Sequence, residues 1–281
     1  MSTLTFTALV GLGSLAAGFL GALTGLGGGV VIVPLLVLVF RVDLHYAMGA
    51  SLVSVIATSS GAAASYVKEG YSNIRIGMLL EIATTVGALA GAWLVASGLV
   101  SKDVIAVIFG LVLLFSAFLS GRHRKERPGD DVPDPLAVRL RLDASYPTAA
   151  GPQPYHVHGV PAGFGLMFLA GVLSGLLGIG SGAMKVLALD QAMRIPFKVS
   201  TTTSNFMIGV TAAASAGIYL SQGYIDPALA MPVMLGVLLG SLLGARVLVV
   251  ARTRLLRRVF AAVILVLAVQ MIYKGLSGGK L

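Results

Sequence analysis

Two short glycine-rich stretches, GLGGG at residues 25–29 and GIGSG at 178–182, interrupt apolar runs and could bind a small anion. Glycine costs about 1 kcal/mol in a helix interior relative to alanine, so such a cluster favours either a break in the helix or very close helix packing. Where a helix breaks, its free backbone N–H groups and the positive end of its dipole attract negative charge. The candidate anion-binding residues in the two stretches are Gly25, Gly27, Gly28, Gly29, Gly178, Gly180, Ser181 and Gly182.

Close helix packing is the alternative explanation for these glycines. Small residues recur at every fourth position from Ala17 to Gly29 and again from Ser174 to Gly182. This spacing is typical of the small-residue ridge that lets membrane helices approach each other closely. It also occurs at 87–91 and 236–244, where we expect packing alone. In the two opening stretches, packing and a broken-helix site are compatible.

Polar residues follow each glycine stretch at the start of the next apolar run. The sequence reads GASLVS at 49–54 and STTTSN at 200–205. Serine, threonine and asparagine are common helix caps, which is the structural explanation. Six polar residues in a row exceed what one cap needs, so some of them are also expected to line a path for the ligand. The candidates are Ser51, Thr202, Ser204 and Asn205.

Charged residues inside apolar segments are costly and mark functional sites by default. Lys185 follows GIGSG by three residues, so an anion held at the broken helix could meet its ammonium group. The alternatives for Lys185 are a structural pair with Asp190, or a side chain that extends toward the membrane surface. Glu81 and Asp190 are candidates for proton coupling, and Glu81 could instead be an interhelical partner.

The composition indicates a protein embedded in the lipid bilayer. Of 281 residues, 57% are hydrophobic and 11% are charged, with a mean hydropathy of +0.93. Soluble domains carry about 25% charged residues. The net charge of +9 comes largely from Lys and Arg in short loops between apolar runs, where a cytoplasmic excess is expected, so a nucleic-acid partner is rejected. Cysteine is absent, neither nucleotide-binding glycine motif fits, and no cofactor or metal is predicted.

The chain matches itself when it is shifted by 153 residues, which predicts an internal repeat. Ser51 then falls on Ser204 and Thr58 on Thr211, while Ile32 falls on Lys185. We expect a first transmembrane repeat at 1–121, a basic, proline-rich cytoplasmic linker at 122–160, and a second repeat at 161–281. The alternating run 138–142 in the linker suggests a short strand. His156 and His158 are interpreted as surface-loop residues rather than metal ligands.

Each repeat opens with an apolar run, at 4–40 and 162–193, that is too long for one membrane crossing and short for two. If each opening run crosses once, 10 Lys and Arg residues lie on the linker side and 8 on the other side. If each run enters and returns, the division becomes 14 against 4, which the positive-inside rule prefers. A hairpin followed by three crossings turns the second copy upside down. We therefore predict an all-α polytopic protein of two inverted repeats, each with about four helical segments.

The sequence resembles the TauE/SafE family of sulfite and organosulfonate exporters. The resemblance rests on ALTGLGGGVVIVPLL at 22–36, GLLGIGSGAMKVLALD at 175–190 and KVSTTTSNFMIGVTAA at 198–213. It implies a multi-pass protein of the cytoplasmic (inner) membrane that carries small sulfur-containing anions, usually outward. Ser181 and Lys185 depart from the glycine-rich pattern of the first copy.

We expect a secondary transporter for an anion such as sulfite, a sulfonate or thiosulfate. An anion channel with the same site is the main rival. A membrane enzyme is the remote one, because it would need a nucleophile and base, or a metal cluster, within the spans. A homo-oligomer is compatible with the sequence.

Overall fold

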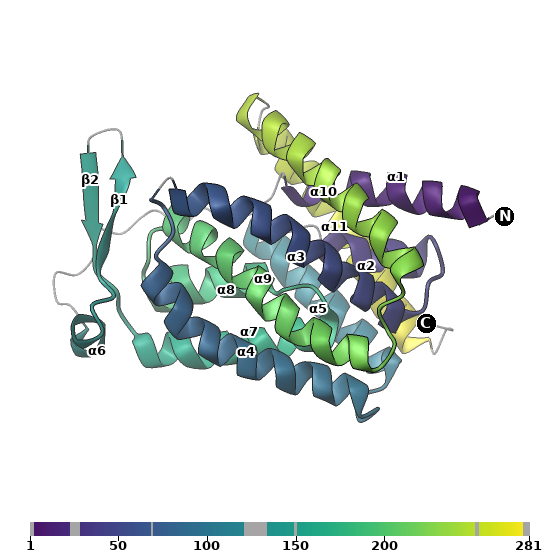
Figure 1. Ribbon diagram of the computed structural model, residues 1–281, viewed down its shortest axis with the longest axis horizontal. Coiled ribbons are helices and arrows are strands. Elements are labelled where there is room, and N and C mark those ends of the chain that lie inside the picture. The colour runs from purple at the N-terminus through teal and green to yellow at the C-terminus, as the bar shows by residue number, and fades with distance from the viewer. Residues whose placement is uncertain are drawn as a thin grey trace.

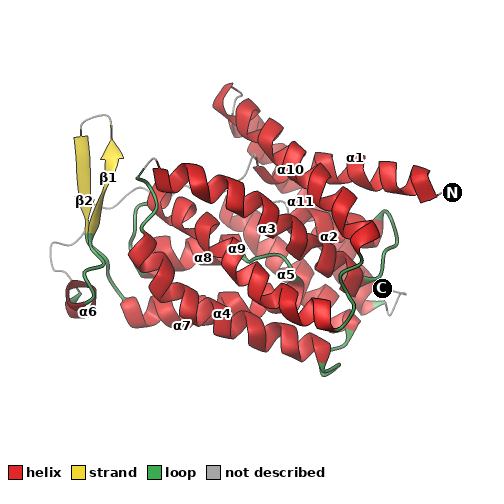
Figure 2. Ribbon diagram, viewed as in Figure 1, coloured by secondary structure: helices red, strands yellow, loops and turns green. Residues whose placement is uncertain are grey.

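A computed structural model describes residues 3–22, 29–68, 70–120, 134–148, 151–250 and 253–277. The described chain is a bundle of helices lying side by side, with a small β-hairpin and a short helix at one end (Figures 1 and 2). The first half contains α1 (Thr3–Ala22), α2 (Gly29–Leu38), α3 (Leu44–Lys68), α4 (Ile74–Ala96) and α5 (Lys102–Ser120). The second half contains α7 (Val160–Leu177), α8 (Gly182–Leu187), the π-helix η1 (Ala188–Ala192), α9 (Phe197–Ser221), α10 (Pro227–Val250) and α11 (Thr253–Leu276).

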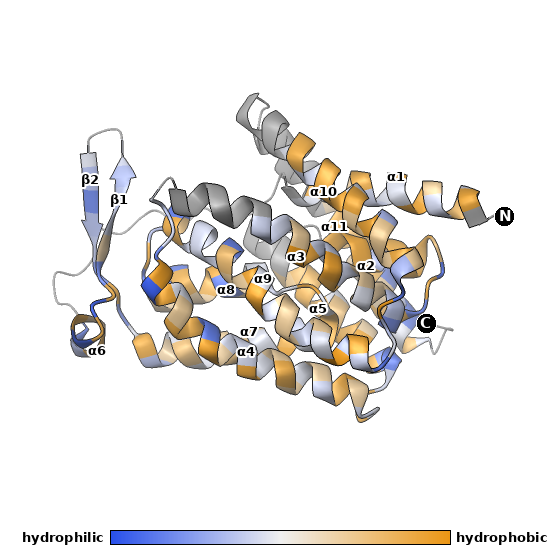
Figure 3. Cartoon of the chain, viewed as in Figure 1, coloured by the Kyte–Doolittle hydropathy of each residue, from blue (hydrophilic) through white to orange (hydrophobic). Residues whose placement is uncertain are grey.

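Several helices are long and apolar enough to cross a membrane. Among the described residues, four segments meet this criterion by length and composition: Leu4–Gly21, Ile74–Ala96, Val160–Leu177 and Pro227–Gly244. Gly29–Leu38 and Ala262–Leu276 are shorter apolar helices. Apolar residues cover most of the helical bundle, and hydrophilic residues gather in the hairpin and in the connecting loops (Figure 3). The chain is therefore a multi-pass helical membrane protein.

Both opening runs fold back on themselves, as the sequence predicts. In the second half, the helix is interrupted after α7. The amide of His158 donates to the carbonyl of Met193 at 3.1 Å, so the two ends of the run lie together. In the first half, the rings of Phe6 and Phe40 meet edge to face at 6.1 Å. Neither run is a single straight helix across the bundle.

Glycines allow four helix pairs of the bundle to approach closely. α1 packs along α10, α4 along α7, α5 along α11 and α3 along α9. A Cβ atom on Gly87 of α4 would lie 2.2 Å from the carbonyl oxygen of Phe168 in α7, so only glycine fits there. Gly171 faces Thr84 and Gly175 faces Ala88, so α4 and α7 run in the same direction. The expectation of close packing at residue 87 is confirmed.

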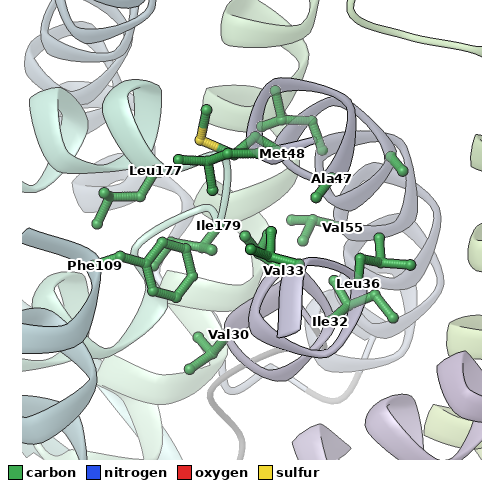
Figure 4. Packing of buried hydrophobic residues seen from close by; sticks show 14 of the residues in the cluster. Val30, Ile32, Val33, Leu36, Ala47, Met48, Val55, Phe109, Leu177 and Ile179 are labelled. Carbon is green, nitrogen blue, oxygen red and sulfur yellow. The ribbon is translucent and has the colours of Figure 1, made fainter. Parts of the chain in front are cut away.

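The main apolar core surrounds α2 and the break after α7. Val30, Val33 and Leu36 of α2 are fully or almost fully buried against α3. Figure 4 shows that Leu177 and Ile179, on either side of the break, point into the same core. Burial of such side chains contributes about 1.5–3 kcal/mol each relative to exposure in water. Within a bilayer, where that driving force is absent, their close packing holds the break after α7 in position against α2 and α3.

The linker differs from the prediction in its secondary structure. The run 138–142 is not a strand, because Pro135 and the capping side chain of Asp134 start the short helix α6 (Pro135–Arg139), which includes the first two residues of the run. The strands lie further along, as β1 (Ala144–Thr148) and β2 (Gly151–Tyr155), paired antiparallel. The all-α expectation is therefore wrong for this segment.

The hairpin packs on the linker-side end of the bundle. Asn73, which caps α4, donates from its amide nitrogen to the hydroxyl of Tyr155 at 2.8 Å and to the carbonyl of Leu142 at 3.0 Å. His156 lies beside Asp143, with its Nδ1 2.9 Å from the carboxylate, and is exposed as expected. A second apolar cluster joins the linker to α4, α7 and the segment before α9.

Candidate functional site

The break between α7 and α8 depends on left-handed backbone angles. Gly178 has φ +65° and ends α7, and its amide donates to the carbonyl of Ser174. Gly180 and Ser181 follow with φ +73° and +45°, and α8 then begins at Gly182. A Cβ atom on Gly178 would also lie 2.7 Å from Cβ of Met48 in α3. Glycine at 178 is therefore required by both its conformation and its neighbour.

Gly29 places the end of the first glycine stretch beside the break between α7 and α8. It begins α2, and a Cβ atom on it would lie 2.9 Å from the Ser51 hydroxyl and 3.3 Å from the carbonyl oxygen of Ile179. The two glycine stretches therefore meet where Gly29 faces Ile179, and Ser51 adjoins Gly29. Gly25, Gly27 and Gly28 lie outside the described residues.

Lys185 points into the bundle from α8. Its side chain has no exposed surface, so the alternative in which it extends toward the membrane surface is wrong. The ammonium donates to the carbonyl oxygen of Met207 at 3.1 Å and, in a very short hydrogen bond, to the hydroxyl of Thr211. Both acceptors belong to α9, which α8 packs against. A buried charge needs such partners, because the interior solvates it poorly.

Glu81 of α4 reaches the same threonine from the opposite side. The Thr211 hydroxyl donates to Oε1 of Glu81 at 2.6 Å, and Thr85 donates to that oxygen at 3.3 Å. Glu81 is 8% exposed. Its second oxygen, Oε2, is buried and has no hydrogen-bond partner among the described residues. Lys185, Thr211 and Glu81 therefore form one buried polar chain across three helices.

Buried hydroxyls near the break have unused hydrogen-bonding capacity. The hydroxyl oxygens of Ser51 and Ser181 have no partner in the part of the chain that the structure describes, and the same holds for Ser174 in the last turns of α7. An unpaired buried polar group costs about 1–3 kcal/mol, so such groups need an explanation. Hydroxyls that bind a ligand in another state would account for them.

The other predicted site residues differ in whether they contact the break after α7. Ser204 donates to the carbonyl of Gly182 at 3.2 Å and so touches the break directly. Thr202 donates to the carbonyl of Tyr71 at 3.0 Å, which ties α9 to the loop before α4. Asn205 and Asp190 are half-buried, the latter on the π-helix η1. Thr202 is therefore placed as a loop contact and Ser204 as a neighbour of the break.

Comparison with known proteins places the chain in a family. Residues 10–271 match the model of the family described as "Sulfite exporter TauE/SafE". The chain belongs to the TauE/SafE family. It is similar to "Probable membrane transporter protein YunE" of Bacillus subtilis, with 28% identity over 97% of this chain and 99% of the relative. It is also similar to YdhB of the same organism, with 28% identity over 82% of this chain and 83% of the relative. No solved structure matches.

Family membership makes this protein a membrane transporter, so the buried contacts between Lys185, Thr211 and Glu81 lie inside a transport protein. Sequence reasoning identified Lys185 and Glu81 but missed Thr211, which joins them. Thr211 was noted only as the repeat mate of Thr58. Its position in an apolar stretch of α9, four residues after Met207, is the sequence signal that could have identified it.

Proposed function

We propose that this TauE/SafE transporter is a secondary carrier of a small sulfur-containing anion across the cytoplasmic membrane. The observation that carries the proposal is the fully buried side chain of Lys185 on α8, the helix that begins directly after the break. A buried cation within an apolar bundle is costly and marks a functional site by default. The sulfur-containing anion comes from the family description, sulfite exporter.

In this proposal the anion binds at the break between Gly178 and Gly182. The hydroxyls of Ser181 and Ser51 offer donors that are unpaired among the described residues. Gly29, which adjoins Ser51, adds the start of α2 from the first half. Helix starts and free backbone amides favour anions, and Lys185 supplies the full positive charge.

The two halves are further proposed to be inverted repeats. Contacts between them recur at the repeat offset: Gly18 packs on Val237, and its counterpart Gly171 packs on Thr84, the counterpart of Val237. Likewise Gly87 meets Phe168, and its counterpart Gly240 meets Leu15. These reciprocal contacts support a two-fold relation between the halves.

Helix directions support the inversion. α4 and α7 are parallel, and both begin beside the linker hairpin, so the second opening run enters from the linker side. α1 runs parallel to α10, because Gly11 lies beside Pro232 and Gly18 beside Val237. Since α10 starts at the opposite side from the linker, the first opening run enters from there. Opposed hairpins that meet near the midplane are typical of inverted-repeat transporters.

A carrier is favoured over a channel by the burial of the proposed site. Lys185 and Ser204 are fully buried and Ser181 is 3% exposed, so an anion would need the helices to move before it could enter or leave. A channel with an open pore would expose these groups to water. Counterflow separates the two, because only a carrier accelerates uptake of labelled anion when unlabelled anion is inside.

Thermal unfolding of the purified protein with an anion panel tests the proposal. The panel holds sulfite, thiosulfate, methanesulfonate, taurine, sulfate and acetate. A ligand at 100 times its dissociation constant adds about 2.7 kcal/mol of stability. We expect stabilisation by at least one sulfur anion, its loss in Lys185→Gln, and its retention in Lys274→Gln, a matched change in the last turn of α11. No stabilisation by any sulfur anion contradicts the proposal.

A further inference from the structure

The hydroxyl of Thr211 lies between an acid and a base that do not touch directly. A hydroxyl has one proton to donate and two lone pairs to accept with. The geometry uses both roles: Thr211 accepts from the Lys185 ammonium, and its proton goes to Oε1 of Glu81 at 2.6 Å, which is closer than the Met207 carbonyl oxygen at 2.9 Å. Glu81 therefore supplies the negative charge that balances Lys185, through a single bridging group.

The other charged groups around Glu81 make contacts of their own. α7, which packs along α4, carries no charged residue. On α9, Lys198 lies in the first turn, with its ammonium 3.9 Å from the centre of the Tyr71 ring, and Tyr219 donates to the carbonyl of Gly175. On α4 itself, Arg75 donates to the carbonyl of Arg141. Asp190, on η1, is the other acid near Lys185 in sequence.

The unpaired oxygen of Glu81 offers a place for a proton. Oε2 is buried and without a partner among the described residues, whereas Oε1 accepts two hydrogen bonds. A carboxylic acid protonated on Oε2 keeps both bonds to Oε1 intact. The site can therefore take up one proton without rearranging the bonds that hold Glu81.

We propose that Glu81 couples anion transport to a proton. In the empty protein its carboxylate is the counter-charge of Lys185. An anion bound at Lys185 takes over that role, and Glu81 binds one proton on Oε2, so that one anion and one proton travel together. This inference rests on the proposed function, because it assumes an anion at Lys185.

Charge balance names the class of anion. The empty site holds one positive and one negative charge, and the loaded site holds Lys185, the anion and a neutral Glu81. A monovalent anion such as bisulfite or a sulfonate leaves both states neutral. A dianion such as sulfate leaves one net negative charge buried, which is costly in this environment. The site should therefore prefer monovalent anions.

Calorimetric binding in two buffers of different ionisation enthalpy tests the coupling. The probe is methanesulfonate, which does not titrate near neutral pH, so any proton taken up goes to the protein. We expect about one proton bound per anion by the unmodified protein. Glu81→Gln, which mimics the protonated acid, should keep anion binding and take up no proton. In proteoliposomes the same variant should exchange anions but lose anion-driven proton uptake.

The outcomes separate this inference from the proposed function. Failure of every panel anion to bind overturns both. Methanesulfonate binding without proton uptake overturns the coupling alone, as does equal proton uptake by Glu81→Gln. Binding of sulfate but not methanesulfonate overturns the monovalent preference.

If Glu81→Gln does not fold, Thr211→Val provides the test. Without the hydroxyl donor of Thr211, the Glu81 carboxylate protonates more readily before the anion binds. Proton uptake per anion should then fall below that of the unmodified protein, and an unchanged value overturns the coupling.

Discussion

Glu81 and Lys185, on different helices of the bundle, are joined through one hydroxyl, that of Thr211. The two charges therefore share a bridging group instead of forming a direct ion pair. This arrangement lets one side be released while the other stays bonded. It underlies both the anion site and the coupling proposed for this transporter.

The bridging hydroxyl is expected to stabilise the fold. Thr211→Val keeps the shape of the side chain but removes one buried hydrogen bond from each of Lys185 and Glu81, leaving Lys185 with the Met207 carbonyl and Glu81 with Thr85. An unpaired buried polar group costs about 1–3 kcal/mol, and we expect the free energy of unfolding to fall by that amount. Thr201→Val is the control, because that hydroxyl is exposed and bonds only within α9. Equal stability losses in denaturant titrations of the two variants would contradict the bridging role.

Close packing of α4 on α7 predicts opposite effects for two glycine substitutions. Gly87→Ala places a methyl group 2.2 Å from the carbonyl oxygen of Phe168 and forces the helices apart, at a cost of about 1–3 kcal/mol. Gly165→Ala, on α7, meets nothing within 4 Å and should gain up to about 1 kcal/mol from helix propensity. Thermal unfolding checks the pair, and a stabilised Gly87→Ala would show that the contact is not formed.

The side chain of Ser181 is expected to lower the stability of the fold and to strengthen anion binding. Its φ of +45° is strained for a residue with a side chain, so Ser181→Gly is expected to stabilise the fold by about 1 kcal/mol. Loss of its hydroxyl should weaken anion binding several-fold. Ser181→Ala separates the effects, because it removes the hydroxyl and keeps the strain. Anion titrations should show equal weakening in both variants; unchanged affinity would remove Ser181 from the site.

Asp43, in the loop before α3, predicts a pH dependence of stability. Burial raises the pKa of Asp43, but hydrogen bonds from Lys102 and the His45 amide outweigh it, so the pKa lies below its ordinary 3.8. Because the folded protein holds this carboxylate ionised more strongly than the unfolded chain does, its contribution is present near neutral pH. The contribution disappears as the pH falls through the folded pKa.

Asp43→Asn measures that contribution. Asparagine can still cap α3, so the variant removes chiefly the ion pair with Lys102. Half-exposed pairs contribute less than about 1 kcal/mol, so we expect a small stability deficit at pH 7 that shrinks as the pH falls below 3.8. Unfolding temperatures across that pH range check it. A deficit that is constant with pH would assign the effect to something other than the charge.

The features that depend on short stretches of sequence, the helix break and the buried lysine, could be predicted from the sequence. The glycines at 178 and 180 break the helix because few other residues adopt positive φ, and the burial of Lys185 follows from its position inside an apolar run. Thr211 could have been singled out as a polar residue in an apolar stretch, but its contact with Lys185 was not predictable, because it depends on the packing of α9 on α8. The linker strand was misplaced because an alternating run of five residues is too short to outweigh the helix start set by Asp134 and Pro135.

Uptake of radiolabelled sulfite by proteoliposomes preloaded with unlabelled sulfite tests the central claim most directly. The comparison is the unmodified protein, Lys185→Gln and Lys274→Gln at equal incorporation. The account predicts accelerated counterflow for the unmodified protein and Lys274→Gln, and a loss of at least tenfold for Lys185→Gln. A tenfold loss corresponds to about 1.4 kcal/mol, well within what one buried charge contributes. Counterflow that persists in Lys185→Gln would contradict an anion site at this lysine.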